Sequence, residues 1–129
     1  MRTTIILGSL LAAHAAGAAG VDVIEEQGIA RMTCTYTVEC LDEEACTFAQ
    51  FGHDMDLPRT LPGDAVLQLG TGPAEGRAAE HNGLLVITAA DGLASYMVST
   101  TLDGLARLSV HIADPLTVVT YHGQCEVTE

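Results

Sequence analysis

Four cysteines are the residues of this chain with the most definite chemistry, and their spacing favours disulfide bonds. Cys40 and Cys46 flank a polar five-residue segment between two strand-like runs. Of the three pairings that four cysteines allow, we predict Cys40–Cys46, which closes the mouth of a hairpin, and Cys34–Cys125, which ties the first strand to the last. Zinc binding and thiol redox chemistry are disfavoured because C-x-x-C and H-x-x-x-H spacings are missing.

The acidic residues Asp42, Glu43 and Glu44 lie inside the loop that the Cys40–Cys46 bridge would close. A cross-linked loop loses little entropy on binding, and its charge speeds encounter with a basic protein. The competing interpretation is that these charges only keep the protein in solution. Calcium binding is disfavoured because the D-x-D-x-D-G spacing is missing. We take Asp42, Glu43 and Glu44 as the candidate partner-binding loop.

A metal site is considered at His53-Asp54-Met55-Asp56, which offers one imidazole and two carboxylates. The segment also fits an acidic strand end beside a proline-containing loop, and it supplies too few ligands for zinc, calcium or magnesium. His111 and His122 are expected on one outward face, about 13 Å apart at the usual strand rise. That separation is too large for one ion, so we predict no metal site.

Nucleophilic catalysis also lacks a recognisable motif. Ser95, Ser99 and Ser109 alternate with apolar residues, and none lies in a G-x-S-x-G or S-x-x-K motif. Gly70-Thr71-Gly72 lacks the lysine and helix of a phosphate loop. We predict no catalytic residue, no cofactor and no enzyme activity. A minor hydrolase would require a serine, a histidine and a carboxylate to converge in one cleft.

The overall charge excludes one class of partner. The 129 residues include 5 Lys+Arg, all of them arginine, against 17 Asp+Glu, so the formal net charge is −12. Nucleic-acid binding is excluded, because phosphate-backbone binders need clustered basic residues. A disordered acidic tail is also excluded, because 48% of the residues are hydrophobic and can form a core.

The first 30 residues are expected to lie outside the folded domain. Residues 1–18 combine an early arginine, a short apolar run and an A-x-A site ending at Ala18, which predicts a secretory signal peptide. Residues 19–30 are interpreted as a leader and residues 31–129 as a single β domain without a membrane span. The Ala- and Gly-rich, lysine-free composition suggests a GC-rich bacterium, so the predicted location is periplasmic or secreted.

Alternating polar and apolar residues predict an all-β domain. Period-two runs bounded by Gly, Pro and Asp indicate a small antiparallel meander of seven or eight strands, either a barrel or a sandwich. Early strands are expected at residues 32–40, 46–55, 65–69 and 84–88, with a weak edge strand at 77–81.

Later hairpins can be placed by matching inward faces across the turns. Asp91-Gly92-Leu93-Ala94 recurs as Asp103-Gly104-Leu105-Ala106, and we predict a three-residue loop at each, with Gly92 and Gly104 left-handed. A four-residue loop is expected at 113–116. The resulting cross-strand partners are Val98 with Leu108, Tyr96 with Val110, and Leu108 with Tyr121.

The layout resembles the small uncharacterised secreted β-proteins of GC-rich bacteria. The features that carry this resemblance are Thr33-Cys34-Thr35-Tyr36 followed by Cys40 and Cys46, and the ending Tyr121-His122-Gly123-Gln124-Cys125-Glu126. In outline the chain is also similar to small periplasmic β-barrel inhibitors of lysozyme. Their Ser-Gly-Ser-Gly-Ala-Arg-Tyr type of loop is absent here, so the resemblance implies a fold and no inhibitory residue.

The favoured hypothesis is a non-enzymatic secreted acidic domain that binds another macromolecule, such as a basic protein. The alternative is a carrier that holds a small ligand or a metal in a barrel cavity. The discriminating observation is whether the interior is filled by side chains or hollow.

Overall fold

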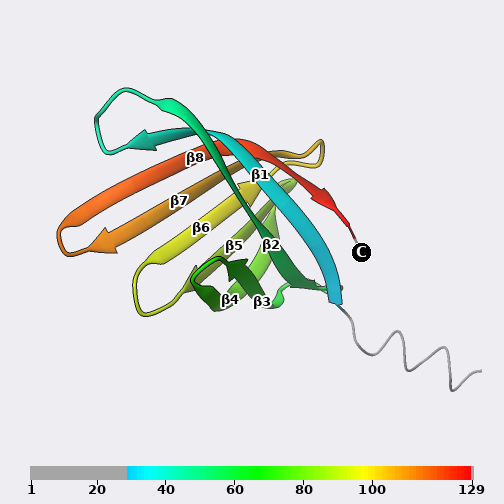
Figure 1. The fold of residues 1–129 in the computed structure, drawn as a ribbon. Coiled ribbons are helices and arrows are strands. Elements are labelled where there is room, and N and C mark those ends of the chain that lie inside the picture. Colours follow the sequence, from blue (N-terminus) through cyan, green and yellow to red (C-terminus); the bar gives the residue numbers. More distant parts are fainter. Residues whose placement is uncertain (1–28, 129) are drawn as a thin grey trace, which may run out of the picture.

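Residues 29–128 form a closed antiparallel barrel in which each strand pairs with the next and β8 pairs with β1 (Figure 1). The computed structural model describes these residues, so the predicted signal peptide and most of the leader lie outside the described part. The strands are β1 (Ile29–Leu41), β2 (Thr47–Pro58), β3 (Gly63–Leu69), β4 (Gly72–His81), β5 (Leu84–Ala90), β6 (Ser95–Thr100), β7 (Leu105–Ala113) and β8 (Leu116–Val127). The predicted all-β meander is confirmed, and it closes as a barrel.

The connections alternate between the two ends of the barrel. Residues 42–46, 70–71, 91–94 and 114–115 turn at one end, which we call the acidic end because it carries Asp42, Glu43 and Glu44. Residues 59–62, 82–83 and 101–104 turn at the opposite end. Strand β4 begins at Gly72 and is hydrogen-bonded to both β3 and β5, so it is not the predicted weak edge strand.

The barrel interior is filled by side chains of alternating size. Tyr36, Met55, Leu67 and Leu108 are fully buried large residues. They are matched by buried alanines on β3, β4, β5 and β7. Eight strands enclose a space just wide enough for side chains to fill, and alternating large and small residues fit its taper. The buried alanines are Ala65, Ala74, Ala78, Ala89 and Ala106.

The seam between β1 and β8 is held by a disulfide and by a close backbone approach. Cys34 and Cys125 are direct cross-strand partners, both buried, and they form the predicted bridge. Gly123 faces the same seam. A Cβ at this position would lie 1.9 Å from the carbonyl oxygen of Thr35 and 2.6 Å from the Cα of Tyr36. Only glycine lets the two strands approach this closely.

A β-bulge on β1 reverses which residues face the interior. The pairing register shifts between Tyr36 and Val38 on both sides of the strand. Beyond the bulge, Glu39 pairs with Tyr121, which packs against the core, so Glu39 shares the inward face. Unbroken alternation along residues 32–40 predicts Glu39 outside and Val38 inside. This placement was wrong because the extra residue of a bulge shifts the alternation by one.

The turn at residues 101–104 has the predicted conformation. Thr101 N–H donates to the Leu105 carbonyl, Gly104 N–H donates to the Thr101 carbonyl, and Gly104 has a φ of +97°. Strands β6 and β7 accordingly pair Val98 with Leu108, as predicted. A three-residue hairpin loop needs a left-handed residue at its last position, which glycine adopts without steric cost.

The matching prediction at Gly92 was wrong. Ala90 pairs with Ser95, so the loop has four residues, 91–94, and Gly92 is not among the residues with positive φ. The Asp91 carboxylate accepts hydrogen bonds from the backbone N–H groups of Leu93 and Ala94, at 2.8 and 2.9 Å. An aspartate that bonds to the backbone ahead of it stabilises a turn without a left-handed glycine.

The β7–β8 hairpin has the predicted register with a shorter loop. Val110 pairs with Val119 and Leu108 with Tyr121, as expected. Ala113 also pairs with Leu116, so only Asp114 and Pro115 remain unpaired, joined by a cis peptide bond. The predicted four-residue loop therefore shortens to two residues without changing which side chains face inward.

Removing each disulfide in turn should show that the seam bridge contributes more stability. Cys34 and Cys125 are 91 residues apart and Cys40 and Cys46 are 6 apart. The chain-entropy model then predicts losses of about 4.5 and about 2 kcal/mol in the free energy of unfolding for the two double-alanine variants. Urea denaturation of the three oxidised proteins measures both losses. Equal losses would contradict this ordering.

The Gly123→Ala substitution should weaken the seam. The added methyl group meets backbone atoms, so the strands must separate, and we expect a loss of about 2 kcal/mol, typical of overpacking. Gly70→Ala is the matched control, because nothing lies within 4 Å of a Cβ there. Thermal and urea unfolding give both values. A Gly123→Ala protein as stable as Gly70→Ala would show that the seam tolerates a side chain.

Candidate functional site

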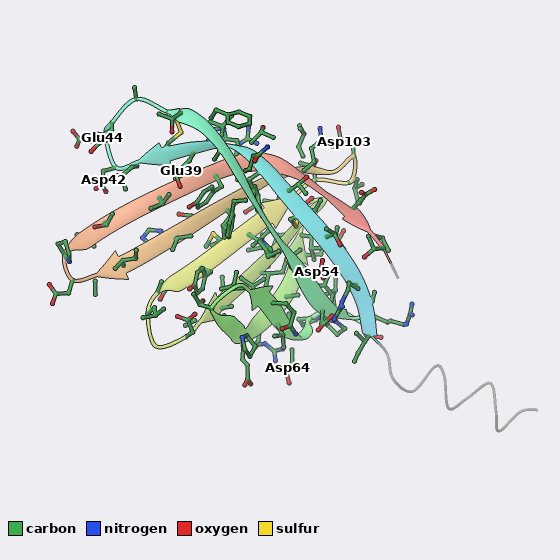
Figure 2. The ribbon with its side chains drawn as sticks, in the orientation of Figure 1. Glu39, Asp42, Glu44, Asp54, Asp64 and Asp103 are labelled. Carbon is green, nitrogen blue, oxygen red and sulfur yellow. A yellow bond between two sulfur atoms is a disulfide. The ribbon has the colours of Figure 1, made fainter. Side chains whose placement is uncertain are left out.

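The acidic loop is hydrogen-bonded to strand β8 at two points. Asp42 N–H donates to the Val118 carbonyl at 2.7 Å, and its carboxylate accepts from Val118 N–H at 2.9 Å. Asp42 adopts a positive φ of 47°, a conformation that aspartate tolerates better than most residues. Figure 2 shows Asp42 and Glu44 at the same end of the barrel as the β7–β8 turn. Asp42 is therefore partly used in positioning its own loop.

The loop is also closed covalently. Cys40 and Cys46 form the predicted bridge, and Glu44 N–H donates to the Leu41 carbonyl at 2.8 Å. Asp42, Glu43 and Glu44 are all exposed. The structure thus places all three predicted acidic residues at the surface, and of these three Asp42 also uses its carboxylate to bind Val118 on β8. The two hydrogen bonds between Asp42 and Val118 help to hold the loop in position.

Exposed apolar side chains that the sequence does not identify lie at the same end of the barrel as this loop. Phe48 is 74% exposed and Leu116 is 77% exposed, and both lie in strand segments at the acidic end. Leu41, beside the loop, is 36% exposed. Their exposure could have been predicted from their position beside the turns, because an apolar residue at the end of a strand has few neighbours that can cover it. The acidic end therefore offers negative charge and apolar area together.

An outer row of residues continues from this loop across the barrel. Val118, which binds Asp42, pairs with His111 on β7, and His111 pairs with Ser95 on β6. The pairing then continues through β5 to β4. Cross-strand partners lie side by side on one face of a sheet. This outer row consists of Asp42, Val118, His111, Ser95, Ala90 and Glu75.

A groove of about 650 Å³ lies along this outer row. Its lining is mostly apolar and spans strands β4 to β7. The Met97 side chain, 45% exposed, contributes apolar surface, whereas Glu75 supplies a carboxylate. No pattern in the sequence predicts this groove, because its residues come from four strands and each strand shows ordinary alternation. Six of its lining residues are Glu75, Thr88, Ala90, Ser95, Met97 and His111.

Ser109 and His111 form a hydrogen bond of 2.9 Å beside the groove. Among the described residues this is the only hydrogen bond of the His111 ring. Glu75, the carboxylate of the groove, is on β4, three strands from His111 on β7. A serine nucleophile is activated by a histidine that a carboxylate orients in turn. The described geometry does not supply that third contact, so we derive no catalytic step from this pair.

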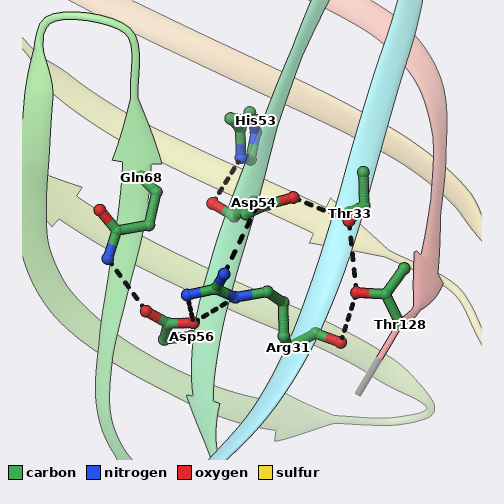
Figure 3. Close-up of polar contacts among 7 residues, drawn as sticks. All are labelled: Arg31, Thr33, His53, Asp54, Asp56, Gln68 and Thr128. Carbon is green, nitrogen blue, oxygen red and sulfur yellow. Dashed lines mark hydrogen bonds and ion pairs between the residues drawn. The ribbon is translucent and has the colours of Figure 1, made fainter.

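The candidate metal ligands at residues 53–56 lie on opposite faces of β2. His53 is buried inside the barrel, whereas Asp54 and Asp56 face outward (Figure 3). Successive side chains of a strand point to opposite faces, so the histidine and the carboxylates cannot converge on one ion. Within residues 29–128, no three His, Cys, Asp or Glu side chains gather at metal-binding distance.

Asp54 and Asp56 instead take part in an outer polar network that joins β1, β2 and β3. Arg31 binds Asp56 at 2.7 and 2.8 Å and lies 3.8 Å from Asp54 (Figure 3). Burial by itself would raise the pKa of Asp56, but hydrogen bonds from Gln68 and Arg31, with the charge of Arg31, outweigh it and lower that pKa. Thr33 donates to Asp54 at 2.7 Å. The network stabilises the strands at this side of the barrel.

His53 is a neutral, fully hydrogen-bonded residue of the core. Its Nδ1 lies 3.2 Å from the Asp54 carbonyl oxygen, and its Nε2 lies 3.0 Å from the Tyr36 hydroxyl. A carbonyl can only accept, so Nδ1 carries the proton and Nε2 accepts from Tyr36. Burial lowers the pKa of His53, and the carbonyl and charge of Asp54 offset this only in part. Burial likewise raises the pKa of Tyr36 well above its ordinary value.

Aromatic rings occupy the interior between this histidine and the acidic end. The ring centroids of Phe51 and Tyr121 are 4.8 Å apart, and Tyr36 lies 6.0 and 5.9 Å from them. Burial, followed by a hydrogen bond and the charge of Glu39, raises the pKa of Tyr121 to about 12. Rings at these distances are in contact. The side chains thus fill the part of the interior where a carrier would hold its ligand.

The chain is, by its fold and site, a small disulfide-bonded β-barrel with an acidic, partly apolar end. No protein-family model, curated protein or solved structure matches it. Across residues 29–128 no helix has the length and apolar character to cross a membrane. The two disulfides are compatible with the periplasmic or extracellular location that the sequence predicts.

Mild acid should destabilise the protein through His53. The unfolded chain takes up a proton near the ordinary histidine pKa of about 6.5, whereas the folded chain, with its lowered pKa, resists protonation. More protons are then bound on unfolding, so stability is highest above pH 6.5 and falls as the pH drops below it. Urea midpoints measured between pH 7.5 and 5 should show this fall.

The His53→Gln variant should lose that part of the pH dependence, because its amide can still bind Tyr36 but does not titrate. His81→Gln, which replaces an exposed histidine at the end of β4, is the matched control and should keep the wild-type fall. If the His53→Gln protein keeps the wild-type pH dependence, the fall in stability below about pH 6.5 arises from other groups.

Proposed function

We propose that this protein is a non-enzymatic binding domain whose acidic end docks onto a basic protein. The observation that carries the proposal is the rigid loop in which Glu43 and Glu44 are exposed. A disulfide, two hydrogen bonds to β8 and one within the loop hold it in place. A preorganised loop loses little entropy on binding, and that cost is a large term in protein association.

The surroundings of the loop support the same function. Negative charge attracts a cationic partner over long range, whereas affinity comes mainly from apolar contacts that exclude water. The exposed Phe48 and Leu116 are suited to supply those contacts, because both lie at the acidic end. The net charge of −12 extends the attraction over the whole molecule. We propose a periplasmic or secreted location, with residues 1–18 as the signal peptide.

Binding to a basic polymer should depend on the loop and on salt. Poly-L-lysine is the probe, and its affinity for the oxidised protein is measured by titration calorimetry at low and physiological salt. We expect affinity to fall with salt, because screening weakens exposed charge pairs. The double variant Glu43→Gln/Glu44→Gln should bind about fivefold more weakly, as expected for two exposed ion pairs.

The matched control removes two charges at the opposite end of the barrel. Glu80 and Glu126 are exposed, and the double variant Glu80→Gln/Glu126→Gln changes the net charge by the same amount. It should bind poly-L-lysine nearly as tightly as the unchanged protein. If both double variants weaken binding equally, only the total charge matters, and the loop has no special role.

A further inference from the structure

The groove over β4–β7 is continuous with the acidic loop. His111 lines the groove and pairs with Val118, to which Asp42 is hydrogen-bonded. The loop and the groove therefore belong to one outer surface, along the outer row from Asp42 to Glu75. A partner that contacts Glu43 and Glu44 would reach the groove by extending sideways across β8 and β7.

The chemistry of the groove matches a side chain with an apolar stem and a cationic head. Ala90 and Met97 provide apolar walls, and Glu75, exposed on β4, supplies a carboxylate. Arg77, the nearest cation on β4, binds Asp64 on the β3 side at 3.0 Å, so its charge is partly neutralised. Lysine and arginine bury their methylene stems along apolar surface while the charged end stays in a polar environment.

We propose that the groove receives a lysine or arginine side chain of the same basic partner that docks on the acidic loop. The inference rests on the proposed function and adds a second contact to it. Counted along the outer row, the loop after β1 and Glu75 on β4 are five strand spacings apart, which is roughly 24 Å along the surface. Two positions of an extended chain with about six residues between them cover that distance. The partner therefore presents two basic positions separated by about six residues of extended chain.

The test uses an extended peptide of about eight residues with lysines at both ends and alternating valine and threonine between them. It is titrated into the isotope-labelled, oxidised full chain, and backbone amide shifts are followed by NMR, which detects weak binding. We expect residues 75, 90, 95 and 111 to shift together with residues 43 and 44. A peptide that keeps only one basic end should bind more weakly and should shift only one of these two groups.

Glu75→Gln should weaken binding of the two-ended peptide by about threefold, the effect expected of one exposed ion pair. Ser95→Arg, which places a cation in the groove, should weaken it further, whereas Glu126→Gln is the control with the same charge loss elsewhere. The inference would be overturned if residues 43 and 44 shift, the groove residues do not shift, and Glu75→Gln leaves the affinity unchanged. That result would leave the proposed function standing. No salt-sensitive binding at either place would overturn both.

Discussion

Closure of the barrel between the first and last strands is the constraint on which the other features depend. Strands β1 and β8 are far apart in sequence, and they are joined by a ladder of backbone hydrogen bonds, a buried disulfide and a glycine that allows close approach. Closure removes the two exposed edges that an open sheet would leave. It also brings the inward faces of all eight strands around one core. Loss of the seam would expose both edges and divide that core.

The acidic end is a consequence of this seam. The bulge on β1 lies where the strand meets both β2 and β8, and beyond it Glu39 turns inward toward Tyr121. The following loop is then held against β8 through Asp42 and Val118. The same contact connects the loop with the outer row and its groove. Strands β4 to β8 pair in sequence, and closure adds the loop after β1 to their outer surface by pairing β1 with β8.

Strand β2 places its buried and its charged residues on opposite faces, because successive side chains of a strand alternate in direction. His53 enters the core as a neutral ring bound to Tyr36, while Asp54 and Asp56 remain outside with Arg31. The acidic groups thus stay in contact with water or with an arginine, where a negative charge is inexpensive. In residues 29–128 most acidic side chains likewise lie on the outer surface, whereas Glu39 faces Tyr121 in the interior.

The sequence by itself determined the features that depend on neighbouring residues and on alternation. The pairing of the four cysteines, the registers from β6 to β8 and the left-handed Gly104 followed from spacing, face matching and turn chemistry. Only the tertiary structure decided the closure as a barrel, the inward turn of Glu39, the four-residue loop at Asp91 and the groove beside His111. Closure, the inward turn of Glu39 and the groove depend on contacts between residues distant in sequence. The Asp91 loop depends on local hydrogen bonds from Leu93 and Ala94 to the Asp91 carboxylate. Neither a bulge nor such a side-chain bond can be recognised in a period-two pattern.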